Sequence, residues 1–194
     1  MPAGAEAPER FPSLLDQRPL TRRALAFATL RHRGQRRTSD SAPFILHPLE
    51  VAQLLSGRDH RDEVVAAAIL HDVVEDTGVE PAEIAERFGP EVAALVEVLS
   101  EPSPVGSYRE RKARLRDAVS RASDEALVIF AADKVAKVRE LRMTIAMGGA
   151  ADPEKLEHYW ASLEMLTAQH AGHPLVQQLR FELEALELLP PHAA

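Results

Sequence analysis

The residues most able to do chemistry lie together in one short segment, ILHDVVEDT, at positions 69–77. It places His71 next to Asp72, and Glu75 and Asp76 follow four residues after each of them. On a helix, residues four apart lie on the same face, so the second pair shares a face with the first. The apolar run VVAAAIL precedes these groups, and placing ionisable side chains against such a run costs several kcal/mol unless their charge is compensated. A divalent cation is the simplest compensation.

Each of these residues taken alone has a simpler explanation. A single histidine on an apolar helix, such as His71, is usually a hydrogen-bonded core residue, and acids at a helix end usually face solvent. Both pairs occur in one helical register at the end of an apolar helix, which favours a metal site over these alternatives.

Two further ligands must come from elsewhere in the chain. His47 precedes Pro48, and a residue before proline is held extended, so we expect His47 just outside a helix start; the alternative is an ordinary loop histidine. Asp133 follows the apolar run LVIFAA in the middle of an expected helix, where it needs a metal ion, Lys134 or Lys137 as partner. Nitrogen and oxygen ligands favour Mn²⁺, Fe²⁺ or Mg²⁺ over structural zinc, and histidines make Mg²⁺ the least suitable.

The composition limits what such a site could do. The chain of 194 residues has no cysteine, which excludes disulfides, a thiolate nucleophile and cysteine-bound zinc. Its net charge of −7 argues against nucleic-acid binding. The stretch 18–37 nevertheless contains seven arginines and no acid, a pattern typical of a site for a small, multiply anionic ligand or of a solvated helix face. No signal peptide is visible, and the longest apolar run is too short to span a bilayer. We expect a cytoplasmic protein without a membrane partner.

The elements that must position these residues are helical throughout. Apolar positions recur with helical spacing, prolines and glycines mark the boundaries, and strand-like alternation is essentially absent. We expect an all-α fold with one domain over residues 18–190, preceded by a flexible segment, 1–17, rich in Pro, Ala and Glu. The expected helices cover about 20–31, 48–55, 64–76, 81–88, 90–99, 109–119, 125–147, 153–171 and 174–189.

Five strings occur in an order typical of a known family. They are HRGQRR (32–37), PFILHPLEVA (43–52), ILHDVVEDT (69–77), FGPEVAALV (88–96) and AADKVAKVREL (131–141). Together they resemble the hydrolase domain of RelA/SpoT homologues, specifically the small alarmone hydrolases of the HD superfamily. The similarity covers about residues 20–142, and its most specific block is HDVVEDT. The resemblance implies a helical HD bundle of about eight to ten helices.

The resemblance also implies an activity. The expected reaction removes the 3′-pyrophosphate of (p)ppGpp, a small phosphorylated nucleotide, and yields GDP or GTP with pyrophosphate. The family's residues match here as a Mn²⁺ site, a pair that positions and activates the attacking water, and an arginine that packs on the purine base. These are His47, His71, Asp72 and Asp133 for the metal, Glu75 and Asp76 for the water, and Arg37 for the base.

The last string departs from the family's usual DRLHNMRTL. Lys137 stands in place of an asparagine and Glu140 in place of a threonine, at positions that help to hold the sugar and phosphate end of the nucleotide, while Arg139 is retained. Lys137 can contact phosphate, whereas Glu140 would repel it unless turned toward Arg139 or Arg142. Thr38 likewise replaces a basic residue.

These departures leave three functions open. The leading hypothesis is a (p)ppGpp 3′-pyrophosphohydrolase that binds substrate through Arg37, Lys137 and Arg139. The second is a phosphohydrolase acting on another phosphorylated nucleotide, for example NADPH. The third is a non-catalytic alarmone-binding module, and the presence of the pair Glu75 and Asp76 counts against it because binding alone needs no water-activating acids.

Overall fold

Prolines and polar caps mark where most helices begin. The computed structural model describes residues 18–56, 59–101 and 105–188. Proline is the first residue of five helices, a position at which the N–H that it lacks would have no helical acceptor. Side chains of Ser107, Ser123 and Asp152 accept backbone N–H groups at three starts. The helices are α2 (Pro19–Arg31), α3 (Leu46–Ser56), α4 (Asp62–Leu70), α5 (Val73–Thr77), α6 (Pro81–Phe88), α7 (Pro90–Leu99), α8 (Tyr108–Ser120), α9 (Asp124–Ala146), α10 (Pro153–His170) and α11 (Pro174–Glu187).

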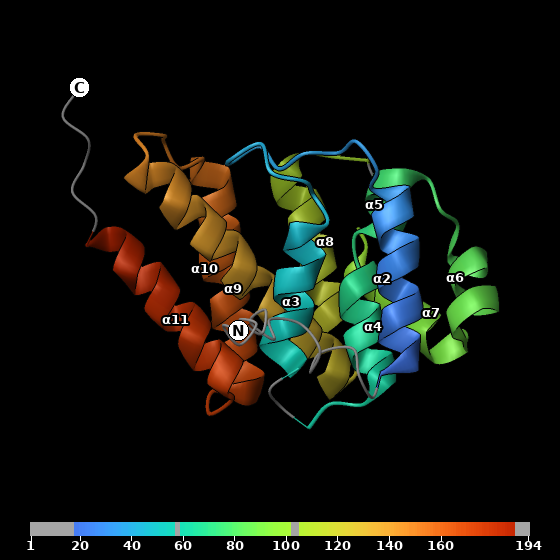
Figure 1. Cartoon of the computed structure of the whole chain (residues 1–194). Coiled ribbons are helices and arrows are strands. Elements are labelled where there is room, and N and C mark those ends of the chain that lie inside the picture. The colour runs from blue at the N-terminus through green and yellow to red at the C-terminus, as the bar shows by residue number, and fades with distance from the viewer. Residues whose placement is uncertain (1–17, 57–58, 102–104, 189–194) are drawn as a thin grey trace, which may run out of the picture.

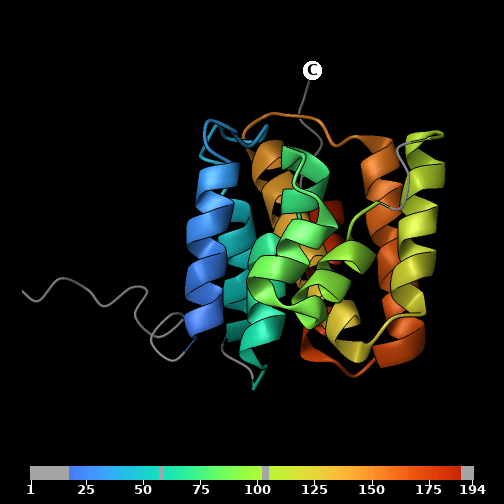
Figure 2. The same cartoon turned by 90° about the vertical axis from the view of Figure 1, so that its right-hand side faces the viewer.

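These helices pack into a bundle with α6 and α11 at opposite ends in Figure 1. In the quarter-turned view of Figure 2, the blue α2 and the yellow-green α8 lie on opposite sides. Within the described ranges no strand forms, and an isolated bridge joins Arg36 to Pro43. The expected all-α bundle is therefore confirmed. The expected flexible segment 1–17 lies outside the described residues.

The core is built around two helices that are apolar on more than one side. Every residue of α4 from 64 to 70 is buried, because α2, α3, α7 and α9 all contact this helix. The first half of α9, residues 126–136, is buried as well, between α3, α7, α8, α10 and α11. Helices buried all round lack a polar face. Any ionisable group on these buried stretches of α4 and α9 must therefore find a partner inside the protein.

The expected continuous helix over 64–76 is wrong, because α4 ends at Leu70 and α5 begins at Val73. His71 and Asp72 lie at the break. The ring Nδ1 of His71 donates a hydrogen bond to the carbonyl of Ala68 at 2.8 Å. In an unbroken helix that carbonyl would accept the N–H of Asp72, so the ring and the backbone compete for it.

The expected position of His47 outside a helix is also wrong. Helix α3 begins at Leu46, which puts His47 in its first turn. The N–H groups of Leu46 and His47 donate to Pro43 and Phe44 at 3.1 and 2.9 Å, so tight turns open the helix early. Pro48 is tolerated there because first-turn N–H groups have no helical acceptor.

The other expected helices match the structure to within about two residues over the described ranges. None of the helices in those ranges combines the length and the apolar character needed to cross a membrane. What matters for the site is that α3, α4 and α9 contact one another, since each pair among them is packed together.

Candidate metal centre

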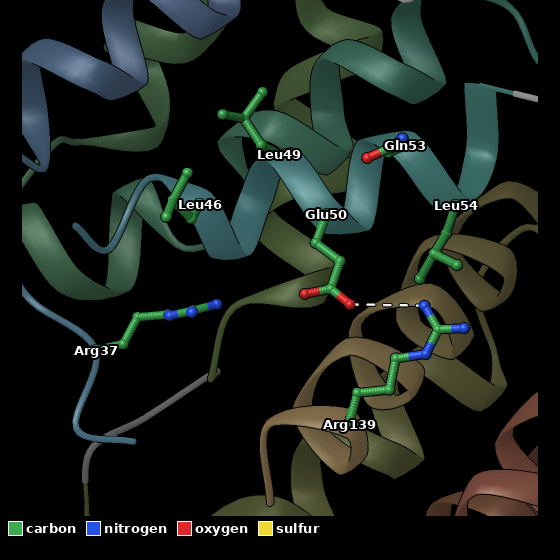
Figure 3. A pocket seen from close by; sticks show the side chains of 7 residues that line it. All are labelled: Arg37, Leu46, Leu49, Glu50, Gln53, Leu54 and Arg139. Atoms are coloured by element: carbon green, nitrogen blue, oxygen red, sulfur yellow. Dashed lines mark ion pairs between the residues drawn. The ribbon is translucent and has the colours of Figure 1, made fainter. Parts of the chain in front are cut away.

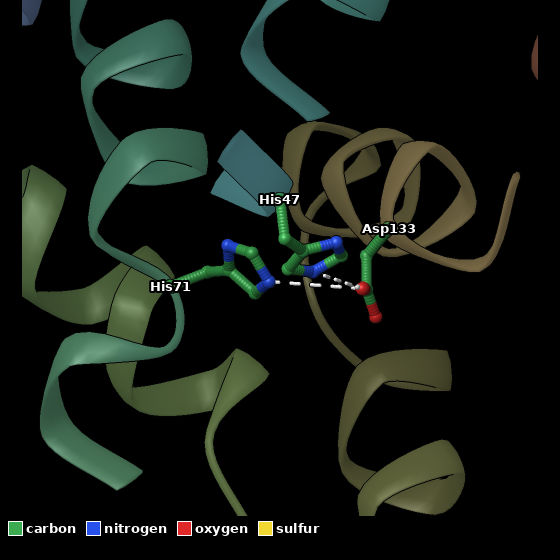
Figure 4. Close-up of side chains that lie close together, drawn as sticks. All are labelled: His47, His71 and Asp133. Carbon is green, nitrogen blue, oxygen red and sulfur yellow. Dashed lines mark ion pairs between the residues drawn. The ribbon is translucent and has the colours of Figure 1, made fainter. Parts of the chain in front are cut away.

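Three helical segments bring their ionisable residues to one point, shown in Figure 4. His47 comes from α3, His71 from the α4–α5 break and Asp133 from α9, and one ligand atom of each lies within 4.8 Å of the others. The Nε2 atoms of His47 and His71 are 3.1 and 3.7 Å from Oδ1 of Asp133. Residues far apart in the sequence thus form one cluster.

Asp72 adds a second carboxylate to this cluster. Its Oδ1 is 3.2 Å from Nε2 of His71, and its Oδ2 is 3.5 Å from Nε2 of His47. The structure therefore brings together all four residues that the sequence suggested as metal ligands. His71 and Asp72 both lie at the break between α4 and α5, so this short segment supplies two of the four side chains.

The unsatisfied atoms of this cluster fit a cation. His47 Nε2, His71 Nε2, Asp72 Oδ2 and Asp133 Oδ1 are buried and have no hydrogen-bond partner in the described part of the chain. A buried polar atom without a partner typically costs about 1–3 kcal/mol, so four at one point need a common partner. Two imidazole nitrogens and two carboxylate oxygens are suitable ligands for a divalent transition metal.

The two histidines differ in what orients the ring and in the direction of the pKa shift. The bond from Nδ1 of His71 to a carbonyl fixes its ring so that Nε2 faces the cluster, a common arrangement for metal-binding histidines. Burial opposes charging of His71, but Asp72 and Asp133 outweigh it and raise its pKa to about 9. Burial and the nearby charge of Lys137 lower the pKa of His47.

Asp133 is the most strongly ionised member of the cluster. Burial raises the pKa of its carboxyl, but Lys134, His47 and His71 together hold that pKa well below its ordinary value. Asp133 thus carries a full negative charge in the interior, which is what a metal ligand requires.

The predicted water-activating pair lies on α5, which directly follows Asp72 in the chain. Glu75 and Asp76 are solvent-exposed on α5. Partial burial, Asp72 and Glu75 raise the pKa of Asp76 to about 6. A carboxyl with a pKa near neutrality can take up and release a proton under ordinary conditions.

Two residues that sequence reasoning missed hold α5 in place. Gln35 donates from Nε2 to the backbone carbonyl of Asp76 at 2.9 Å. Its amide oxygen accepts from Nδ1 of the buried His32 at 2.6 Å. Both residues belong to the HRGQRR string, which stands out in the sequence by its resemblance to the family. The contact of this string with α5 exists only in the folded chain and could not be read from the sequence.

Arg37 and Glu140 form an ion pair. Arg37 Nε lies 3.1 Å from Oε1 of Glu140, and its guanidinium also binds Asp40. Ser39 donates to the same oxygen of Glu140 at 2.9 Å. The charge of Glu140 is therefore offset by Arg37, a partner that the sequence did not suggest beside Arg139 and Arg142.

Arg139 forms ion pairs with residues other than Glu140 and the metal-ligand candidates. Its Nε is 2.8 Å from Oε1 of Glu182, which is buried on α11, and its Nη1 is 3.6 Å from Glu50. Figure 3 shows Arg37 and Arg139 on opposite sides of Glu50, in a cavity of about 510 Å³. The structure thus places Arg139 in the same cavity as Arg37, across Glu50 from it, and not among the metal-ligand candidates.

Lys137 links the metal-ligand cluster to a second, smaller cavity. It lines a space of about 200 Å³ with Glu140, Thr38 and Tyr159 among its neighbours. Burial opposes the charge of Lys137, but Asp72 and Asp133 outweigh it and raise its pKa. Lys137 therefore acts electrostatically on two of the metal-ligand candidates while its side chain lines this cavity.

The chain is similar to a family and to several known proteins. The family model described as HD domain matches residues 24–153. The chain is 32% identical over 142 residues to guanosine-3′,5′-bis(diphosphate) 3′-pyrophosphohydrolase MESH1 of Xenopus tropicalis, covering 72% of this chain and 79% of that protein. The corresponding Danio rerio protein is 33% identical over 139 residues, covering 70% and 77%.

Longer proteins and solved structures are similar as well. GTP pyrophosphokinase rsh of Brucella melitensis is 31% identical over 86% of this chain, but the chain spans only 22% of that relative's length. The structure of a metazoan ortholog of SpoT that hydrolyses ppGpp has a TM-score of 0.76 at 24% identity, covering 96% of this chain and 100% of that one, and supports the fold alone. A Listeria monocytogenes EGD-e crystal structure has a TM-score of 0.66 at 26% identity, covering 74% and 99%. The chain thus belongs to the HD-domain family.

Proposed function

We propose that this protein is a metal-dependent hydrolase that removes the 3′-pyrophosphate of (p)ppGpp and releases GDP or GTP with pyrophosphate. The observation that carries the proposal is the convergence of four buried, unpartnered ligand atoms from α3, the α4–α5 break and α9. The MESH1 proteins, of which the chain covers more than three quarters, are named for this activity. The substrate would be a small phosphorylated nucleotide.

The proposed ligands are His47, His71, Asp72 and Asp133, and Mn²⁺ is the proposed cation, with Fe²⁺ or another divalent ion as the alternative. A cation bound there would stabilise phosphoryl charge and lower the pKa of a bound water. The protein's own contribution is to hold four ligand atoms in place before the cation arrives, since α3, α4 and α9 are packed together.

Glu75 and Asp76 are the proposed acid–base pair. They extend from α5 beside Asp72, within reach of water because both side chains are exposed. With a pKa of about 6, Asp76 is mostly ionised at neutral pH and can accept a proton from water. General-base catalysis of this kind typically contributes about 10²–10⁴-fold to the rate.

The proposed substrate contacts come from two sides. Lys137 would bind phosphate from the small cavity, and Arg37 would bind the purine base. Arg139, expected from the sequence to bind substrate, already pairs with Glu182 and Glu50, so a direct contact would require it to leave them. We therefore rank Arg37 and Lys137 ahead of Arg139 as substrate residues.

A second candidate is hydrolysis of another phosphorylated nucleotide, such as NADPH. The ion pair between Glu140 and Arg37 supports this second candidate. It engages the arginine that was assigned to the purine base, and it places a carboxylate in the small cavity. A module that only binds an alarmone is disfavoured, because binding alone does not require the water-activating acids Glu75 and Asp76.

The test is turnover by purified protein with Mn²⁺ on a panel of ppGpp, pppGpp, NADPH and common nucleotides. Pyrophosphate released from ppGpp supports the first function, and orthophosphate released from another substrate supports the second. Asp72→Ala and Glu75→Ala should abolish or strongly reduce turnover, whereas Glu97→Gln, which changes an exposed acid on α7, should not. Unchanged activity in Asp72→Ala would contradict the site assignment.

A further inference from the structure

Lys134 is a buried cation directly beside a proposed metal ligand. Only 7% of its side chain is exposed. Its Nζ donates a hydrogen bond to Oδ2 of Asp133 and lies 4.4 Å from the centre of the Phe130 ring. Burying an ammonium group is costly unless it is paired. The carboxylate and the aromatic face offset part of this cost and hold the ammonium group in place.

The two oxygens of Asp133 are thereby divided. Lys134 takes Oδ2, while Oδ1 lies 3.1 Å from Nε2 of His47 and has no hydrogen-bond partner within the described residues. A carboxylate without such a restraint can rotate and bind a cation through either oxygen or both. The ion pair leaves one defined oxygen facing the cluster.

This ion pair does not join one part of the fold to another. Phe130, Asp133 and Lys134 all belong to α9, so breaking the pair disconnects no two helices. A salt bridge that only tied the bundle together would link different elements, as Arg139 of α9 does with Glu182 of α11. The effect of Lys134 is therefore local to the carboxylate of Asp133.

Among the residues that the structure describes, no second anion competes with Asp133 for the ammonium group of Lys134. Within 4.0 Å its only acidic partner among the described residues is Asp133. From the neighbouring helices, Lys112 of α8 acts on Lys134 as a cation, and Lys134 itself acts on His158 of α10. Asp133 is therefore the single anionic partner of the ammonium group within the described residues, and it accepts the hydrogen bond from Nζ.

We infer that Lys134 is a positioning residue that holds Asp133 as a one-oxygen ligand for the cation. The inference rests on the proposed metal site and goes beyond it by assigning a role to a residue outside the ligand set. Electrostatics and positioning make opposite predictions here. Removing a nearby positive charge should strengthen binding of a cation, whereas releasing the carboxylate should weaken it.

Three substitutions separate these effects, with Mn²⁺ binding to the metal-free protein measured by calorimetry. Lys134→Met and Lys134→Gln both lack the charge, but only glutamine can donate to Asp133. We expect the methionine variant to bind Mn²⁺ about 10–100-fold more weakly than the glutamine variant, the range typical for lost outer-shell partners. Lys134→Arg keeps charge and donor and should stay within about threefold of the parent. Arg121→Gln removes an exposed cation that pairs with Asp117 and not with any proposed ligand, and it should leave affinity unchanged.

The outcomes are distinguishable. Methionine and glutamine variants of equal affinity, or tighter binding by the methionine variant, would overturn the positioning role. Should Lys134→Met not fold, Phe130→Leu removes the ring beneath the ammonium group and should weaken Mn²⁺ binding several-fold; unchanged affinity would count against the inference. Absence of Mn²⁺ binding by the parent would overturn the metal site as well. Metal binding without ppGpp turnover would overturn the proposed function alone.

Discussion

Acid should destabilise this protein through one buried histidine. His158 of α10 is 4% exposed, and its Nδ1 lies 2.7 Å from Nη1 of Arg116. A guanidinium can only donate hydrogen bonds, so Nδ1 accepts and the ring is neutral. Burial, Lys134 and Arg116 lower the pKa of His158 to about 2.

The magnitude follows from the difference between folded and unfolded chains. The folded pKa is depressed below the ordinary value of 6.5, so below that value the unfolded chain binds a proton that the folded chain does not. Stability is therefore lost as the pH falls. Between about pH 7.5 and pH 5 the loss from this one group is about 2 kcal/mol, and it is nearly the same for any folded pKa below about 4.

Urea unfolding at the two pH values measures this effect, with His158→Gln as the control. Glutamine can still accept from Arg116 but does not titrate. The parent should lose about 2 kcal/mol more than the variant between the two pH values. Equal losses would refute the reasoning, because they would mean that His158 binds its proton as readily in the folded protein as in the unfolded chain.

Other consequences can be checked alongside. Glu75→Gln should lower kcat on ppGpp by about 10²–10⁴-fold with Mn²⁺ affinity retained; unchanged kcat would remove Glu75 from the mechanism. Arg139→Ala leaves the buried Glu182 with Arg142 as its remaining cation, so urea unfolding should show a loss of about 1–3 kcal/mol, and a change in KM without a change in stability would reverse our ranking of Arg139. Mn²⁺ at about 100 times its Kd should raise the free energy of unfolding by about 2.7 kcal/mol. A chelator should reverse that gain, and a similar gain in Asp133→Asn would place the ion elsewhere.

The sequence predicted the helices well because their boundaries are marked locally. Pro81, Pro90, Pro153 and Pro174 each begin a helix where proline spacing and apolar periodicity indicated. The break at His71 was not predictable in this way. It accompanies a hydrogen bond between a ring and the carbonyl of Ala68, and helical periodicity is insensitive to such a competition.

The candidate ligands could be named from residue types, apolar context and family resemblance, but their convergence depends on how α3, α4 and α9 pack. Partner choice was less predictable still. Glu140 lies 101 residues from Ser39 and binds it, and Arg139 lies 43 residues from Glu182. Either arginine near Glu140 in the sequence was a plausible partner, and only the fold brings Arg37 to it instead.

The most direct test of the central claim is product identification from ppGpp by ³¹P nuclear magnetic resonance, with and without Mn²⁺. The account predicts GDP and pyrophosphate in the presence of the cation, no products with a chelator, and no products from Asp133→Asn. Release of orthophosphate, or turnover that survives both the chelator and the substitution, would contradict it.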